Sequence, residues 1–168
     1  MRGLQMVCVA LVLALASCGE EGPSPAEKAR MDDADVAAVK AAQTPPPSPV
    51  TPEKILYPDI EKYDLFGAGC NFAPEGSMAA IALAQPSKGY MKIDGKLEAF
   101  APDAGSGDIP LGAKGKYTSA AWSFLIDLAA GEGEQAGSEV LNYPAKFVLR
   151  NDRDQIVYEA NGVAQCGS

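Results

Sequence analysis

Side chains able to do chemistry are few in this 168-residue chain, and their types exclude the commonest active sites. Histidine is absent, which excludes Ser–His and Cys–His nucleophile activation, the commonest general base and every histidine-containing metal site. Cysteine occurs at Cys8, Cys18, Cys70 and Cys166, and neither Cys70 nor Cys166 has a CxxC partner. Thiol catalysis is therefore not expected.

Carboxylates are the only plentiful catalytic groups. Glycoside hydrolysis needs two of them across a cleft, one with a raised pKa. Asp103, Asp108 and Asp127 are the candidates for a carboxylate-only hydrolase, although nothing in their spacing brings them together. Residues 151–154 (Asn-Asp-Arg-Asp) carry three oxygen-bearing side chains, but Arg153 lies among them and no EF-hand glycine follows. A hairpin turn is favoured there over a calcium site, and no catalytic, cofactor or metal site is expected.

Two glycine-containing segments have the appearance of motifs but lack their spacing. Residues 112–116 (Gly-Ala-Lys-Gly-Lys) would require Gly at Pro110 and Ser or Thr at Tyr117 to form a phosphate loop. Residues 104–108 (Ala-Gly-Ser-Gly-Asp) lack the GxSxG spacing of a nucleophile elbow. Both segments are predicted to be loops between strands.

The N-terminus has the pattern of an export signal. Arg2 precedes an apolar run over residues 6–16, which is shorter than the about 20 residues that a membrane-spanning helix needs. The run ends in Leu15-Ala16-Ser17-Cys18, which matches the lipobox at all four positions, so the chain resembles a bacterial lipoprotein precursor. The resemblance implies cleavage before Cys18 and a lipid on its sulfur and amine. Gly19 in place of Asp resembles sorting to the outer membrane, facing the periplasm.

Export places the remaining cysteines in an oxidising compartment. Cys8 leaves with the signal and Cys18 carries lipid, so Cys70 and Cys166 are an even pair and are predicted to form a disulfide. Closing a loop of nearly 100 residues contributes on the order of 4–5 kcal/mol in the chain-entropy model. The bond would fasten the start of the folded domain to its last residues.

The charge of the chain limits its partners. The formal net charge is −8, and removal of Arg2 with the signal changes it to −9. Nucleic acid and anionic headgroups require clustered Lys and Arg, so neither is an expected partner. An acidic surface attracts a basic protein or cations instead.

Three segments are expected, a signal peptide over 1–17, a lipidated tether over 18–54 and a disulfide-linked β-domain over 55–168. In the tether, Ser24, Pro25 and Glu27 form a helix-start signature, and alanine-rich sequence continues to Gln43. This predicts a marginal, solvated helix. Residues 44–52 predict a polyproline II spacer.

Short strands dominate the expected domain, after one helical turn at Tyr57–Tyr63. A short apolar run covers 78–84. Residues 117–128 match a strand through Trp122, Phe124, Ile126 and Leu128, and a helix nearly as well, with the strand preferred.

Two hairpins have predictable registers. In residues 90–100, a three-residue loop over 94–96 pairs Ile93 with Leu97, Met91 with Ala99 and Lys92 with Glu98, whereas Asp-Gly propensity favours a two-residue turn. Cross-strand complementarity favours the three-residue loop. In the last hairpin, a loop over 151–154 pairs Leu149 with Ile156, Phe147 with Tyr158 and Lys146 with Glu159.

The fold expected from these elements is mainly β, a small antiparallel barrel or sandwich of about 6–8 strands. The same plan resembles the membrane-bound inhibitors of c-type lysozyme, which are small β-barrel lipoproteins. In those inhibitors, a Ser-Gly-containing segment precedes a Tyr and a Trp. Residues 112–117 and Trp122 resemble this arrangement, although the Ser is missing here and a long tail follows Gly131.

The expected function is that of a non-catalytic envelope binding module. Its contacts would be the membrane, through the lipid on Cys18, and a periplasmic protein of unknown identity. The alternatives are a carboxylate-only hydrolase, a structural envelope protein and a lysozyme-inhibitor-like protein.

Overall fold

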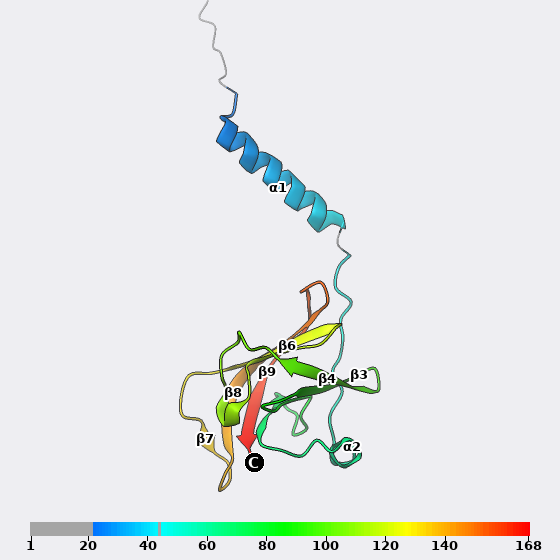
Figure 1. Ribbon diagram of the computed structural model, residues 1–168, viewed down its shortest axis with the longest axis vertical. Coiled ribbons are helices and arrows are strands. Elements are labelled where there is room, and N and C mark those ends of the chain that lie inside the picture. Colours follow the sequence, from blue (N-terminus) through cyan, green and yellow to red (C-terminus); the bar gives the residue numbers. More distant parts are fainter. Residues whose placement is uncertain (1–21, 44) are drawn as a thin grey trace, which may run out of the picture. The chain divides into compact units, whose positions relative to one another are not determined.

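The computed structural model describes residues 22–43 and 45–168 (Figure 1). Two compact units, Met1–Pro45 and Pro46–Ser168, make up the chain. The expected signal peptide over 1–17 and the lipidated Cys18 lie outside the described residues, so both stay predictions. Of the helices in the described ranges, none combines the length and the apolar character needed to cross a membrane.

Helix α1 (Pro25–Gln43) forms where the sequence predicts it, and none of its residues is buried. The N–H of Glu27 donates to Ser24 Oγ (3.3 Å), and the N–H of Ser24 donates to Glu27 Oε2 (2.9 Å). This is the predicted capping box, and the hydrogen bonds from Ser24 lower the pKa of the Glu27 carboxyl. The helix depends on its cap and its alanines because no core supports it.

The second unit is a closed eight-stranded antiparallel barrel with one extra strand (Figure 1). In sheet order the barrel is β6-β5-β4-β3-β2-β1-β9-β8, with β8 closing on β6, and β7 adds to β8. The expected class is confirmed, and of the two predicted architectures the barrel is the one found. The elements are α2 (Tyr57–Tyr63), β1 (Gly69–Pro74), β2 (Ala82–Ala84), β3 (Gly89–Ile93), β4 (Lys96–Pro102), the 3-10 turn η1 (Pro110–Gly112), β5 (Lys116–Thr118), β6 (Trp122–Leu128), β7 (Glu134–Gln135), β8 (Leu141–Asn151) and β9 (Ile156–Gly167).

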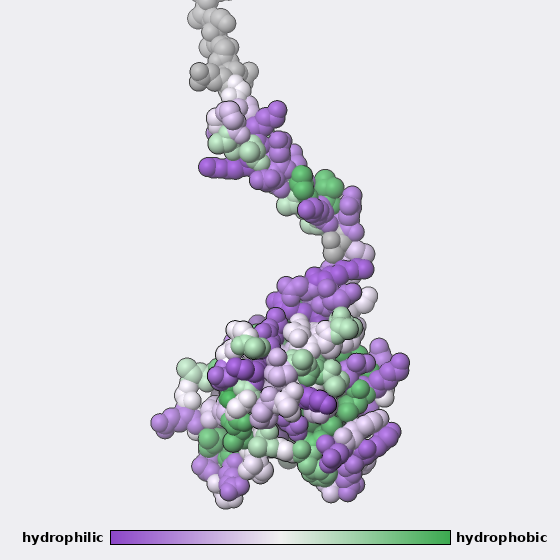
Figure 2. Space-filling view, in the orientation of Figure 1, coloured by the Kyte–Doolittle hydropathy of each residue, from purple (hydrophilic) through white to green (hydrophobic). Residues whose placement is uncertain are grey.

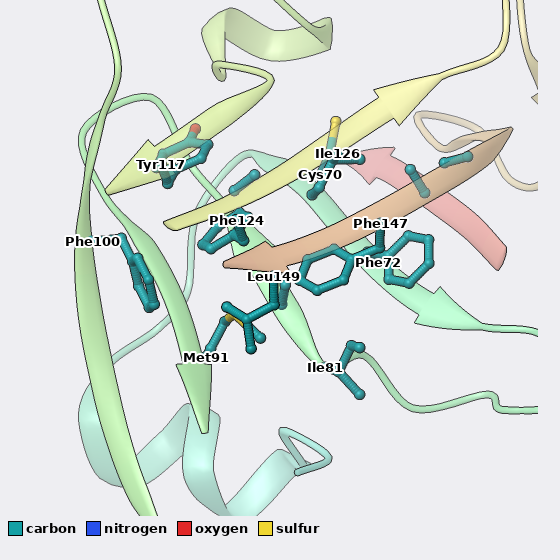
Figure 3. Packing of buried hydrophobic residues seen from close by; sticks show 14 of the residues in the cluster. Cys70, Phe72, Ile81, Met91, Phe100, Tyr117, Phe124, Ile126, Phe147 and Leu149 are labelled. Atoms are coloured by element: carbon teal, nitrogen blue, oxygen red, sulfur yellow. The ribbon is translucent and has the colours of Figure 1, made fainter. Parts of the chain in front are cut away.

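Aromatic side chains fill the inside of the barrel (Figure 3). The Phe147 ring lies 5.0 Å from Phe72 and 5.7 Å from Phe124, and Phe124 stacks on Tyr117 at 5.1 Å. All four side chains are almost completely buried, and burial of each contributes about 1.5–3 kcal/mol. Because side chains occupy the interior, binding sites are to be sought on the outside of the barrel.

The predicted disulfide is confirmed. Cys70 on β1 and Cys166 on β9 are directly opposite partners in neighbouring antiparallel strands, with their Cα atoms 4.0 Å apart. The bond joins the first strand of the barrel to the last, over a sequence separation of 96 residues.

The predicted register of the β3–β4 hairpin is wrong. Ile93 pairs with Lys96 and Met91 with Glu98, so the loop is the two-residue Asp94-Gly95 turn, and both turn residues have positive φ. The preference of Asp-Gly for a two-residue turn therefore outweighs the pairing of complementary side chains across the two strands. The observed register also places Phe100 opposite Gly89, where a Cβ would lie only 2.7 Å from the Tyr117 and Phe124 rings.

The β8–β9 hairpin forms, but its predicted pairs are also wrong. Leu149 pairs with Tyr158 and Phe147 with Ala160, with a bulge between Leu149 and Arg150. The small Ala160 leaves room for the Phe147 ring among the other core aromatics. Lys146 and Glu159 are not opposite each other, yet their side chains still form a 3.0 Å ion pair.

Other predictions within the barrel have mixed outcomes. The preference for strand over helix in residues 117–128 is confirmed, because Phe124 and Ile126 on β6 are buried and alternate with exposed residues. The segment is not one strand, however, since Tyr117 lies on β5 and pairs with Phe124 across a turn. Helix α2 is confirmed at its expected position. The apolar run over 78–84 contributes only the short strand β2, and Met78 is fully exposed.

Part of the expected tether belongs to the barrel unit. Residues 46–54 fall within this unit. The N–H of Val50 donates to Val157 O on β9 (3.1 Å), and the N–H of Glu53 donates to Lys92 O on β3 (2.8 Å). The spacer is therefore bonded to two strands before α2 begins.

Candidate functional site

A largely apolar cleft of about 440 Å³ lies between α2, the start of β1 and the end of β9. We call it the apolar cleft. Its apolar walls are Tyr57, Ile60, Leu65, Phe66, Leu83 and Val140. Its polar lining consists of amide and hydroxyl groups from Asn71, Gln85, Gln165 and Ser168.

Asp59 fixes the position of α2, the outer wall of this cleft. Its Oδ2 accepts the backbone N–H of Leu56 at 3.0 Å, and its Oδ1 accepts Lys92 Nζ from β3 at 3.0 Å. The hydrogen bond from Leu56, followed by that from Lys92, lowers the pKa of the Asp59 carboxyl, and Asp59 in turn raises the pKa of Lys92. One carboxylate therefore caps the helix and attaches it to the barrel.

The segment after α2 forms the floor of the cleft. Leu65 is 4% exposed, and its carbonyl accepts Gln85 Nε2 at 2.8 Å. Gly69 then brings the chain against β2, where a Cβ would lie only 2.3 Å from Ala84 O. Only glycine, which has no Cβ, permits this close approach of β1 to β2.

Aromatic rings on the rim of the cleft are exposed. Tyr57 is 62% exposed and Phe66 60%, with Leu56 at 51% beside them. Figure 2 shows green apolar surface among polar surface in the lower part of the barrel unit, where α2 lies in Figure 1. Several large apolar side chains exposed around one cleft are typical of an interaction site.

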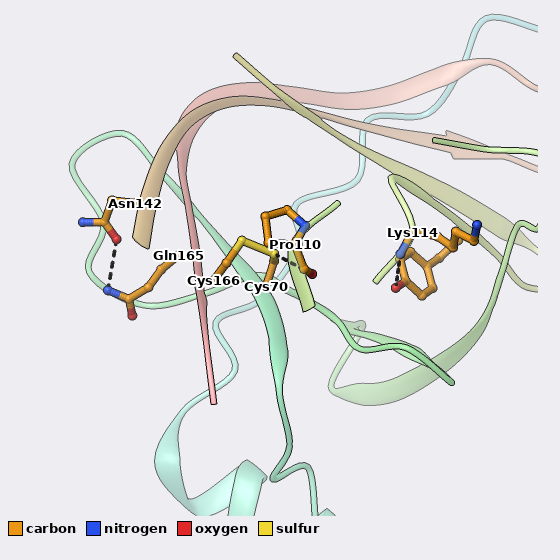
Figure 4. The surroundings of a disulfide bond; sticks show 7 residues. Cys70, Pro110, Lys114, Asn142, Gln165 and Cys166 are labelled. Atoms are coloured by element: carbon orange, nitrogen blue, oxygen red, sulfur yellow. Dashed lines mark hydrogen bonds between the residues drawn. A yellow bond between two sulfur atoms is a disulfide. The ribbon is translucent and has the colours of Figure 1, made fainter. Parts of the chain in front are cut away.

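The disulfide and its neighbours form the inner end of the cleft (Figure 4). Cys70 lines the cleft, and its sulfur lies 3.9 Å from Pro110 O, a contact without a hydrogen because the sulfur is bonded to Cys166. Gln165 Nε2 donates to Asn142 Oδ1 at 3.2 Å. The covalent bond and this amide pair fix β1, β8 and β9 relative to one another.

A second cleft of about 420 Å³ lies between the loop before η1 and strand β6, and we call it the polar cleft. Asp108 and Asp127 both line it, but Asp103 does not. Asp108 is ion-paired with Lys114 at 2.5 Å and its side chain is 76% exposed, while Asp103 pairs with Lys116 at 3.6 Å. The structure thus brings together two of the three candidate acids, in open solvent.

Tyr117 connects the surroundings of the two clefts from inside the barrel. Its OH donates to Gln85 O at 2.7 Å and accepts the N–H of Lys114 at 2.9 Å. Gln85 lines the apolar cleft, and Lys114 is the ion-pair partner of Asp108. Burial raises the pKa of the Tyr117 phenol, so at neutral pH it stays protonated and able to donate.

The glycine-containing segments use their own amides internally. The N–H of Gly115 donates to Gly107 O at 2.9 Å, the N–H of Ala113 donates to Pro110 O at 3.4 Å, and that of Lys114 donates to Tyr117. Amides engaged in this way are not turned toward a phosphate. In this fold Tyr117 is internal and Trp122 packs against the core, so neither residue of the inhibitor-like segment stands free on a loop.

The turn over 151–154 is also satisfied by its own groups. Asn151 Oδ1 accepts the N–H groups of Arg153 (3.0 Å) and Gln155 (2.9 Å). Arg150 Nη1 lies 3.7 Å from Asp154 Oδ1. Within residues 22–43 and 45–168, no three acidic or cysteine side chains form a group able to hold a metal ion.

Sequence reasoning missed the apolar cleft. Tyr57, Tyr63 and Phe66 cluster before Gly67 at the start of the domain, and this density of aromatics is the one signal that could have indicated it. No family model, curated protein or solved structure matches the chain. The two clefts are therefore the features from which we infer a function.

Proposed function

We propose that the chain is a non-catalytic binding module of the cell envelope, held by a lipid on Cys18 in the outer membrane and facing the periplasm. The observation that carries the proposal is the apolar cleft with its exposed aromatic rim. Tyr57 and Phe66 each have about three-fifths of their surface open to solvent, 62% and 60%. A partner that covers them gains hydrophobic burial together with aromatic contacts, which dominate many interfaces.

The walls of the cleft are held before any partner arrives. Asp59 attaches α2 to β3, Gln85 holds the Leu65 carbonyl, and the disulfide joins β1 to β9. A preformed site loses little conformational entropy on binding, which raises affinity for a given contact area. This suits a module that captures its partner by shape.

The carboxylate-only hydrolase is a second candidate, because Asp108 and Asp127 share the polar cleft. A general acid needs an environment that favours its protonated form. Asp108 forms an ion pair with Lys114 at 2.5 Å, and its side chain lies largely in solvent and not in an enclosed pocket. The geometry therefore favours binding over hydrolysis.

The test is a crosslinking pull-down from envelope extract with residues 18–168 carrying Cys18→Ser as bait. A Phe66→Ser bait removes one of the two exposed rings of the rim, and an Ile156→Ser bait changes another exposed apolar residue (43%), at the start of β9. We expect one partner, captured near stoichiometrically by the parent bait and by Ile156→Ser and lost with Phe66→Ser.

The identity of that partner separates the remaining roles. Captured lysozyme that loses activity on binding would identify a lysozyme inhibitor, and a wall or membrane scaffold protein would identify a structural role. Equal capture by the Phe66→Ser bait would show that the apolar cleft is not the binding site. Capture of nothing would contradict the binding module and leave hydrolysis at Asp108 and Asp127 to be assayed.

A further inference from the structure

We infer that the occupant of the apolar cleft is a basic, amphipathic protein segment, with a large apolar side chain in the cleft and Lys or Arg side chains on its rim. The inference rests on the proposed function and names the chemistry of the partner. It follows from the charges around the cleft, from the aromatic rings of the rim and from the size of the cleft.

Exposed acidic residues are direct sequence neighbours of residues that form the apolar walls, on separate segments. Glu61 and Asp64 stand next to the lining residues of α2 and its C-terminal end, and Glu139 precedes the lining residue Val140. Glu139 Oε2 accepts the hydroxyl of Ser168, the last residue, at 3.2 Å. Ser168 lines the cleft, so this hydrogen bond places the Glu139 carboxylate beside it.

In the part of the chain that the structure describes, Glu61, Asp64 and Glu139 form no salt bridge, whereas Asp59 is paired with Lys92. The whole chain carries a formal charge of −8. An apolar floor with an unpaired acidic rim complements a segment that is apolar at its centre and basic at its edges.

The aromatic rings of the rim accept cations as well. Lys62 Nζ already lies 4.8 Å from the centroid of the Tyr63 ring on α2. Tyr57 and Phe66 present comparable rings to solvent, so a Lys or Arg from a partner can stack on them. An acidic partner would instead bring its carboxylates against Glu61, Asp64 and Glu139.

The volume of about 440 Å³ admits one or two large side chains and not a folded domain. A local segment of the partner is therefore the part that binds. A strongly acidic chain also attracts a basic segment from a distance, because its summed negative charge raises the association rate at low salt.

The test uses residues 18–168 with Cys18→Ser and fluorescent twelve-residue peptides built from Leu, Trp and Lys in an amphipathic pattern. A matched peptide replaces every Lys with Glu, and a third replaces every Lys with Ser. Anisotropy titrations give the affinities. We expect the Lys peptide to bind about tenfold or more tightly than the other two, and more weakly as NaCl is raised.

Variants assign the binding to this site. Phe66→Ser should lower the affinity for the Lys peptide about tenfold. Glu61→Gln combined with Glu139→Gln should remove most of the difference in affinity between the Lys and Ser peptides. Ile156→Ser should change neither the affinity for the Lys peptide nor that difference. Circular dichroism verifies that each variant is folded.

Other outcomes overturn the inference in distinguishable ways. Equal or tighter binding of the Glu or Ser peptide, still lost in Phe66→Ser, would overturn the basic partner and leave the binding module intact. If none of the three peptides binds, or if the chain self-associates and Phe66→Ser abolishes this, the basic segment is not the occupant of the cleft. The proposed function itself fails only if the envelope pull-down also captures nothing.

Discussion

The apolar and polar clefts have nearly the same volume, about 440 and 420 Å³, yet their surroundings differ. In the polar cleft, Asp108 has its cation within the fold, Lys114 at 2.5 Å. In the apolar cleft, the rings of Tyr57 and Phe66 are largely exposed, and within residues 22–43 and 45–168 the neighbouring acids Glu61, Asp64 and Glu139 form no salt bridge. Volume alone therefore does not select a site. The apolar cleft is distinguished by exposed rings and unpaired acids, which a partner can cover.

The largest expected effect comes from removing the disulfide, which borders the apolar cleft through Cys70 and does not line the polar cleft. The variant Cys70→Ser with Cys166→Ser should lose about 2–5 kcal/mol of unfolding free energy in urea titrations. Amide hydrogen exchange should rise more in β1 and at the end of β9 than in residues 106–109. Unchanged stability, or a uniform rise in exchange, would contradict a local role for this bond.

Tyr117→Phe tests the link between the two clefts. The substitution leaves Gln85 O without its donor and the Lys114 N–H without its acceptor, at a cost of about 1–3 kcal/mol in unfolding free energy. NMR shifts should change at Gln85 on one side and at Lys114 on the other. A response confined to one cleft would show that Tyr117 does not connect them.

Asp59 makes the apolar cleft sensitive to acid. Its pKa is lowered on folding from the ordinary 3.8, so its stabilisation is complete above that value and is lost as the pH falls through the folded pKa. Asp59→Asn should flatten the acid limb of the stability–pH curve and loosen α2. Circular dichroism unfolding at a series of pH values measures the slope. An Asp59→Asn curve parallel to that of the parent chain would refute this role.

The smallest effect is expected in the polar cleft. Asp127→Asn should change stability by less than about 0.5 kcal/mol, because Asp127 is exposed and forms no ion pair in the described part of the chain. Partner binding should also be unchanged. Cleavage of a cell-wall glycan by the parent chain, lost in Asp127→Asn, would contradict the comparison and favour the hydrolase.

Local patterns predicted the parts of the fold that depend on local chemistry. The Ser24 cap, helix α2 and the strand pattern through Phe124 and Ile126 follow from neighbouring residues, and the Cys70–Cys166 bond follows from counting cysteines.

The registers depended on packing that no local pattern contains. Phe100 settles opposite Gly89 because the rings of Tyr117 and Phe124 leave no room there for a side chain. Phe147 settles opposite Ala160 for a similar reason. The apolar cleft was missed because its walls come from separate segments, and the exposure of Phe66 is decided only when α2, β1 and β9 meet.

The most direct test of the central claim compares the two clefts within living cells. A photo-crosslinking amino acid replaces Phe66 at the apolar cleft or Leu125 at the polar cleft, both exposed positions (60% and 38%). If a partner covers the apolar cleft, irradiation will give a discrete protein adduct from position 66 and no adduct from position 125. An adduct from position 125 alone would contradict that claim.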